Sequence, residues 1–162
     1  MKKVRCMDNS TQGYIAAFLA QYDTLAIATE DEGQPYVTRV FYAEGPIEEH
    51  GLVLYGTFIT SSRKLANLRN NPRVGLFIGP QEPTMWLEGT ATAHVLTDEK
   101  ETQKIREVLG QKSSVAAGFI ARVPIAAVEL KVQWLRITDI AANPMITEVT
   151  FDAVTGKEQE RR

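Results

Sequence analysis

The chain has 162 residues, 44% hydrophobic and 23% charged, which is the ordinary composition of a one-domain globular protein. A formal net charge of -2 gives no overall attraction to nucleic acid, so we expect no nucleic-acid partner. One cysteine and two histidines make a disulfide or a zinc cluster unexpected, and no apolar run reaches the ~20 residues of a membrane span. We therefore expect a single cytoplasmic domain over residues 1–162, with no metal site and no membrane association.

The first predicted elements are a helix and a β-hairpin. Apolar side chains at helical spacing predict an amphipathic helix over residues 10–22, which Asn9 would cap. Short apolar and β-branched runs predict strands over residues 25–29 and 35–43, joined by a turn that holds Gly33.

The middle of the chain alternates strands with a short helix. An acidic Gly-Pro loop over residues 44–51 leads to residues 52–57, which are β-branched and aromatic enough for a strand. Residues 61–72 predict a short helix that starts at serines and stops at Asn-Pro, and residues 74–78 predict another strand. Residues 85–95 alternate small or apolar side chains with polar ones, which predicts a long strand with one wet face.

Two helices are expected next. Thr97 or Asp98 can cap a helix that Gly110 would end, and residues 112–122 predict a second, shorter helix.

A strand period returns at the end of the chain. The residues expected to share its apolar face are Val128, Leu130, Val132 and Trp134. Residues 146–151 can add an edge strand, and residues 152–162 are expected to be frayed. Because most linkers are too short for parallel crossovers, the fold class is mainly β with appended helices: an antiparallel barrel or sandwich over about residues 24–138.

Residues 61–74 have the features of a site for an anion. The first N–H groups of a short helix lack internal partners and lie at the positive end of the helix dipole. Arg63 could bind a phosphate bidentately, Lys64 could add a point charge, and Ser61 or Ser62 could donate a hydroxyl bond. A surface helix with solvated basic residues would give the same spacing. The flanking strands are therefore needed to distinguish an anion site from such a helix.

Four blocks occur in a fixed order along the chain. They are Pro-Tyr-Val-Thr-Arg-Val at residues 35–40, Leu-Tyr-Gly-Thr at 54–57, Ser-Arg-Lys at 62–64 with Asn-Pro-Arg-Val at 71–74, and Trp-Leu-Glu-Gly-Thr-Ala at 86–91. Together they resemble the FMN-binding split-barrel family related to pyridoxamine 5'-phosphate oxidase, over roughly residues 25–105. The resemblance implies an antiparallel split β-barrel and a homodimer with FMN at its interface. It also implies an oxidoreductase that transfers hydride or electrons between a reduced nucleotide or another small molecule and an unknown acceptor.

The resemblance also implies which residues hold the cofactor. Arg63 and Lys64 match the pair that binds the FMN phosphate, and backbone groups of residues 40–42 are expected at the edge of the isoalloxazine ring. The full set of cofactor-binding residues is Arg39, Val40, Phe41, Tyr42, Tyr55, Gly56, Thr57, Ser61, Ser62, Arg63, Lys64, Thr84 and Trp134.

Several positions depart from the oxidase. Thr38 stands where the oxidase has an arginine, so the neighbouring Arg39 would point to the opposite face of the strand unless a bulge intervenes. Gly56 replaces a threonine that Thr57 could supply, and Thr84 replaces a glutamine beside the flavin.

The C-terminal segment departs further. The arginine- and tryptophan-rich segment of the oxidase is reduced to Trp134 and Arg136 at unmatched spacing. We therefore do not expect pyridoxamine phosphate as substrate, and the wall that selects the substrate is expected from residues 111–122 and 134–147. No catalytic residue is singled out.

Other cofactors remain open at this point. A relative of the same fold could be a deazaflavin-dependent reductase. A non-catalytic flavin- or haem-binding protein is a further alternative, with His50 and His94 as possible haem ligands, although neither lies in a matching motif.

Overall fold

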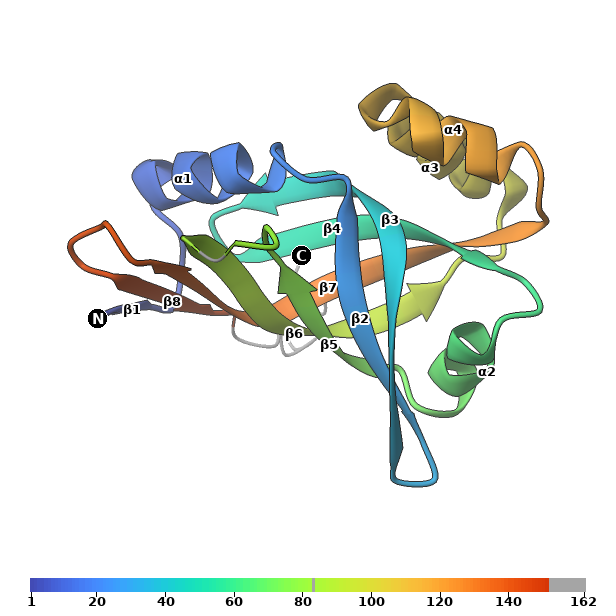
Figure 1. Ribbon diagram of the computed structural model, residues 1–162, viewed down its shortest axis with the longest axis horizontal. Helices are drawn as coiled ribbons and strands as arrows, with labels where there is room; N and C mark the ends of the chain where they lie inside the picture. Colours follow the sequence, from blue (N-terminus) through green and yellow to red (C-terminus); the bar gives the residue numbers. More distant parts are fainter. Residues whose placement is uncertain (83, 152–162) are drawn as a thin grey trace, which may run out of the picture.

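The protein is described by a computed structural model covering residues 1–82 and 84–151 (Figure 1). Its elements in chain order are β1 (Lys2–Val4), α1 (Asn9–Leu19), β2 (Thr24–Asp31), β3 (Gln34–Glu48), β4 (Gly51–Ile59), α2 (Arg63–Asn70), β5 (Arg73–Ile78), β6 (Met85–Val95), α3 (Glu99–Lys112), α4 (Ser114–Ile120), β7 (Ile125–Asp139) and β8 (Ile146–Thr150). Residues 152–162, which the sequence predicts to be frayed, lie outside the described residues.

The strands form a split barrel. Within the described ranges, β7, β4, β3, β2, β5 and β6 pair antiparallel in this order, and β6 pairs again with β7, which closes the ring. One edge of β7 is shared, because residues 125–131 pair with β4 and residues 134–138 pair with β8. The barrel is split because β4 pairs with the first part of β7 and β8 with the second part (Figure 1). The predicted split barrel is confirmed, and the sandwich alternative is wrong.

The β2–β3 hairpin forms as predicted but is longer. Glu32 and Gly33 have φ values of 49° and 80°, and two successive positive values make the tight turn that matches the twist of paired strands. The predicted loop over residues 44–51 is wrong over most of its length, because β3 continues to Glu48. A bulge between Glu44 and Ile47 accommodates Gly-Pro within the strand.

Strand β7 changes face at a bulge. Thr90 pairs with Trp134 and Ala91 with Val132, so Gln133 is the extra residue. Leu135, with no exposed surface, therefore continues the buried face of β7, and the predicted place of Trp134 on that face is wrong. Gly89 is required nearby, because a Cβ there would lie 2.7 Å from the carbonyl oxygen of Trp134.

Helices cover the barrel at three places. Helix α1 packs on β3, α2 packs against β2, β4 and β6, and α3 lies across β3, β4 and β7 and carries α4 (Figure 1). The largest buried side chains of the barrel core include Phe18, Leu25, Leu54, Phe58 and Leu65. No helix in residues 1–82 or 84–151 has the length and apolar character needed to cross a membrane.

Two helix ends differ from expectation. The side chain of Asp8, and not of Asn9, caps α1 by accepting a hydrogen bond from the Thr11 N–H at 2.7 Å. Asp98 caps α3 as predicted, but α3 does not end at Gly110 and continues to Lys112. Ser113 then separates α3 from α4 and caps α4.

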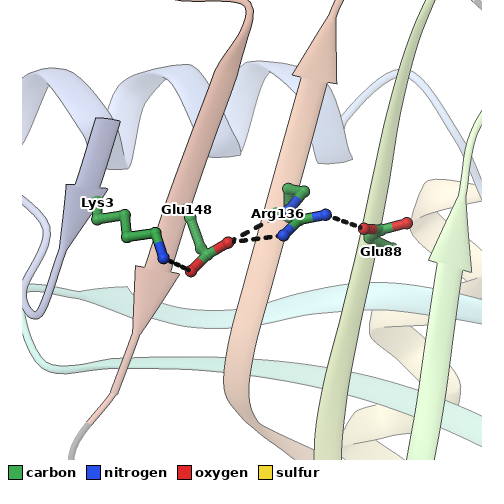
Figure 2. A network of polar contacts seen from close by, with 4 residues as sticks. All are labelled: Lys3, Glu88, Arg136 and Glu148. Carbon is green, nitrogen blue, oxygen red and sulfur yellow. Dashed lines mark hydrogen bonds and ion pairs between the residues drawn. The ribbon is translucent and has the colours of Figure 1, made fainter. Parts of the chain in front are cut away.

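Strand β8 is not an edge strand, because β1 pairs with it in parallel. Figure 2 shows a polar network that crosses β1, β8, β7 and β6. Arg136 donates to Glu148 at 3.0 Å and to Glu88 at 3.2 Å, while Lys3 lies 3.5 Å from the other oxygen of Glu148. The hydrogen bond from Arg136 lowers the pKa of Glu148. The network joins the β1–β8 extension to the barrel.

Candidate functional site

A pocket of about 150 Å³ lies on the outside of the barrel. Its lining residues come from β2, β3, β4, α2 and α4, and they are Thr24, Arg39, Val40, Phe41, Thr57, Ile59, Lys64 and Phe119. Five of these residues are among those that the sequence singles out for the cofactor. The resemblance therefore brings together residues that share a pocket in the structure.

Strand pairing places the polar and aromatic groups of the pocket on one face. Thr24 pairs with Phe41, so their side chains share a face of the sheet. Tyr42 pairs with Gly56, and the period of two puts the preceding Phe41 and the following Thr57 together on the opposite, outer face. Arg39 has the parity of Phe41 and lines the pocket, whereas Thr38 does not. Arg39, and not Thr38, therefore lies on the pocket side of β3, and residues 34–41 pair with β2 without a bulge.

Thr57 brings an unpaired hydroxyl to the pocket. The residue is 3% exposed, and its Oγ1 has no hydrogen-bond partner in the described part of the chain. Burying a hydroxyl without a partner costs about 1–3 kcal/mol, so such groups are rare unless something else binds them. Thr57 is thus a pocket residue whose buried hydroxyl has no hydrogen-bond partner among the described residues.

Lys64 brings a cation to the pocket. Burial lowers the pKa of its amine, and its Nζ lies 5.9 Å from the centre of the Phe58 ring. The ion pairs formed within residues 1–82 and 84–151 do not include Lys64. A partly desolvated amine without a counterion favours an anion in the same pocket.

The start of α2 is held beside the end of β4. The N–H of Ser62 donates to the carbonyl of Ile59 at 2.9 Å, and its hydroxyl oxygen accepts from the N–H of Leu65 at 3.4 Å. Because the hydroxyl of Ser62 acts as acceptor in this cap, its own O–H remains able to donate. Lys64 reaches the pocket from the first turn of the helix thus anchored.

An aromatic pair forms another wall of the pocket. Phe41 of β3 and Phe119 of α4 have ring centres 5.7 Å apart with planes tilted by 48°. Phe119 belongs to the segment 111–122 expected to supply the substrate wall, and no described residue of 134–147 lines this pocket. Sequence reasoning did not single out Phe119, Thr24 or Ile59, because only the segment 111–122 carried a signal and the other two are ordinary strand residues.

Tyr42 and Tyr55 have other surroundings. The hydroxyl of Tyr42 donates to the carbonyl of Leu19 at 2.7 Å inside the core, and burial raises the pKa of this phenol. Its backbone N–H donates to Asp23 O at 2.9 Å, so that donor is also occupied. Tyr55 packs with Ile105 and Leu109 of α3 in a second apolar cluster, and burial raises its pKa too.

Other predicted residues lie outside the pocket lining. Gly56 is buried, and a Cβ there would lie 3.1 Å from the ring of Phe58. Ser61 is exposed, and Arg63 is exposed with its guanidinium 5.0 Å above the ring of Tyr36.

Thr84 and Trp134 lie towards the far end of the barrel. Met85, the residue after Thr84, pairs with Asp139, whereas Ile59 of the pocket pairs with Ile125, and these partners are the two ends of β7. Trp134 is half-buried with the guanidinium of Arg136 5.4 Å from its ring centre. A single chain therefore does not bring these two residues to the pocket.

The histidines are also outside the pocket lining. His50 lies in the β3–β4 turn, 3.6 Å from a carboxylate oxygen of Glu49, and His94 is exposed on β6, where it pairs with Glu129 of β7. Within the described ranges, no three side chains of His, Cys, Asp or Glu gather as a metal site would require.

The described residues form a split barrel with a pocket on its outer face. A model of the family described as pyridoxamine 5'-phosphate oxidase matches residues 12–141. The chain belongs to this family, in its broad sense of split-barrel relatives of the oxidase. No curated protein matches the chain in a sequence search.

Solved structures share the fold at low identity. A Clostridium acetobutylicum protein related to general stress protein 26 of B. subtilis, of the pyridoxinephosphate oxidase family, is 14% identical with a TM-score of 0.67, over 90% of this chain and 98% of that one. A FAD-binding protein from Mesorhizobium loti is 17% identical with a TM-score of 0.61, over 82% and 95%. A heme binding protein from Mycobacterium smegmatis is 18% identical with a TM-score of 0.66, over 89% of this chain and 60% of that one. Proteins of this fold are thus named for flavin and for haem.

Proposed function

We propose that the chain is an FMN-binding oxidoreductase whose pocket on the outer face of β2, β3 and β4 forms one part of the cofactor site. The observation that carries the proposal is that Thr57 and Lys64 line the same pocket, while within the described residues the Thr57 hydroxyl has no hydrogen-bond partner and the Lys64 amine no ion-pair partner. A flavin mononucleotide needs a hydrogen-bond donor or acceptor for its polyol chain or ring and a cation for its phosphate.

The phosphate would lie at the start of α2. Lys64 would neutralise it from the pocket side and Arg63 from the rim, while Ser62 can still donate its O–H. The N–H groups of Arg63 and Lys64, at the start of α2, add to the same positive end of the helix.

The isoalloxazine ring would lie along β3. Among the three expected backbone contacts, the N–H of Tyr42 is already bonded to Asp23, so the contacts fall to Val40 and Phe41. Transfer of hydride or electrons would be the chemistry of the bound flavin, while the chain binds, orients and shields it. Phe41 and Phe119 would exclude water from that side of the ring.

A second copy of the chain is needed to complete the site. Ligand pockets for molecules of this size usually measure about 300–1,000 Å³, and the pocket here holds about 150 Å³. Arg39, which lines the pocket, pairs with Ala26, which pairs with Phe77, so the three side chains share the outer face of β3, β2 and β5. This outer face carries Phe77 and Val37, which are 43% and 65% exposed. We expect the second copy to cover this face and to supply the groups that one chain holds away, such as Thr84 or Trp134.

Haem is the weaker alternative for this chain, because neither His50 nor His94 lines the pocket. A deazaflavin shares the ring and phosphate chemistry, and FAD differs by its added adenylate. The electron donor and acceptor are small molecules still to be identified, and a cytoplasmic location stays a prediction from the sequence.

Titration of the cofactor-free protein tests the proposal. FMN, riboflavin, FAD, a deazaflavin and haemin would be added in turn, with flavin fluorescence and visible absorption as readouts. We expect FMN to bind most tightly and riboflavin more weakly, because riboflavin lacks the phosphate that Lys64 would neutralise. Tighter binding of riboflavin than of FMN, or a haemin complex with no flavin binding, would overturn the assignment.

A further inference from the structure

The guanidinium of Arg63 lies over an aromatic ring from the β2–β3 hairpin. Its central carbon lies 5.0 Å from the centre of the Tyr36 ring, within the range of a cation–π contact. Arg63 is the first residue of α2, and Tyr36 lies near the start of β3, so the contact joins two elements that are distant in the sequence.

A buried hydrogen bond fixes the same two elements beside this contact. The amide of Asn67 donates to the Thr29 hydroxyl at 3.0 Å, and both residues are 2% exposed. Thr29 pairs with Tyr36, so their side chains share a face, and Asn67 follows Arg63 by one helical turn. One side of α2 therefore faces the β2–β3 hairpin through two contacts, Arg63 with Tyr36 and Asn67 with Thr29.

Helix α2 thus directs its first two cations to different places. Lys64 lines the pocket, whereas Arg63 is exposed and lies over the ring of Tyr36. The ion pairs within the described residues do not include Arg63. The contact with Tyr36 therefore restricts the direction of the long and flexible side chain of Arg63.

A cation–π contact holds a guanidinium over a ring without a hydrogen-bond acceptor. The N–H donors of Arg63 therefore do not serve this contact and can bind a phosphate. A side chain fixed in this way loses less conformational entropy when it binds an anion.

We propose that Tyr36 is a positioning residue for the cofactor phosphate: it holds Arg63 beside the start of α2 with its N–H groups available. This inference rests on the proposed function, because it requires a ligand phosphate at that place. Its contribution is that of an exposed cation–π contact, about a two- to fivefold change in affinity.

Affinities for FMN and riboflavin, measured side by side in Tyr36 variants at low salt, test the inference. We expect Tyr36→Leu to weaken FMN binding about two- to fivefold and to leave riboflavin unchanged, because only FMN has the phosphate. Tyr36→Phe keeps a ring under Arg63 and should retain most of the FMN affinity. In an Arg63→Ala background, Tyr36→Leu should have no further effect.

The outcomes separate the inference from the function. A wild-type chain that binds no flavin would overturn the proposed function. A wild-type chain that binds FMN, combined with an unchanged or tighter FMN affinity in Tyr36→Leu, would overturn the role of Tyr36 alone. Equal losses for FMN and riboflavin would also overturn it, since they indicate a general disturbance of the hairpin. Tyr36→Met serves as a second variant without a ring if Tyr36→Leu does not fold.

Discussion

Within the described residues, Thr57 lacks a hydrogen-bond partner for its hydroxyl and Lys64 lacks an ion-pair partner for its amine. These two groups distinguish the pocket as a candidate binding site. A buried hydroxyl and a half-buried amine both lower the stability of the folded chain when nothing binds them. Residues kept at such a cost are expected to act on a ligand. Stability and binding should therefore change in opposite directions when either group is altered.

Replacing Thr57 by valine removes the hydroxyl and keeps the shape. We expect the free energy of unfolding of the cofactor-free protein to rise by about 1 kcal/mol, because an unsatisfied buried group is lost. FMN affinity should fall severalfold in the same variant. Denaturant unfolding and FMN titration measure the two effects, and Thr57→Ser is the matched control that keeps the hydroxyl. A less stable Thr57→Val protein would contradict the interpretation.

The amine of Lys64 gives the pocket a dependence on pH. Burial lowers its pKa below the ordinary value of 10.5, so the unfolded chain keeps this proton to a higher pH than the folded chain does. In the cofactor-free protein, the contribution of Lys64 to the free energy of unfolding therefore rises as the pH increases from the folded pKa towards 10.5.

A bound phosphate reverses this preference because it stabilises the charged amine. FMN affinity should therefore fall as the pH rises through the folded pKa, by at most about tenfold per pH unit. Lys64→Arg keeps its charge throughout and should lose this alkaline fall. FMN titrations of both proteins across neutral and alkaline pH give the comparison, and an identical fall in both would exclude Lys64 as its source.

Lys112, at the C-terminal end of α3, makes polar contacts between this helix and the barrel. Lys112 donates to the carbonyl of Leu19 at 3.1 Å and to the carboxylate of Glu44 at 2.8 Å, and its amine lies 3.9 Å from the centre of the Tyr42 ring. Helix α4, which brings Phe119 to the pocket, follows directly after this point. Lys112 therefore connects the end of α1, strand β3 and the aromatic wall.

Removing this amine should be costly. Lys112→Met leaves Glu44 half-buried without its cation, and we expect the free energy of unfolding to fall by about 2 kcal/mol. Lys112→Met combined with Glu44→Gln should lose less than the sum of the two single variants, because the pair is removed together. Denaturant unfolding of the four proteins completes the cycle, and strict additivity would show that the pair is not coupled.

The sequence predicted elements best where the local pattern and the tertiary contacts agree. The two faces of β6 follow from alternation alone, whereas Gly110 lies inside α3 and Gln133 forms a bulge that no periodicity shows. Strand β1 is short and basic, and it is a strand only because β8 lies beside it. Local rules missed β1 and the bulge in β7 because pairing with a distant segment determines both.

The candidate site was predictable in part for the same reason. Arg39 and Lys64 lie in blocks that resemble a family, Phe41 directly follows one of these blocks, and the structure places all three in one pocket. The approach of Phe119 and the missing partner of Thr57 depend on contacts between remote segments, so no local pattern shows them.

At the scale of the whole molecule, the outer face of β2 and β5 should be the contact between two copies. Phe77→Glu puts a charge on this face, where burial against a second copy would leave it unpaired. We expect this variant to be a monomer with weakened FMN binding. Sedimentation of the purified protein measures the state, and Val108→Glu on α3, where the valine is 36% exposed, is the control on another surface. A Phe77→Glu protein with the mass of the wild type would place the contact elsewhere.

The central claim is that the start of α2 and the adjoining pocket hold a flavin phosphate. The most direct measurement is the cofactor content of protein purified from cells, by visible absorption and by chromatography of the released chromophore. The wild-type chain should purify yellow with FMN, and the folded Arg63→Ala, Lys64→Ala double variant should purify without it, because both cations of the phosphate site are gone. A double variant that purifies yellow with a full content of FMN would contradict the account.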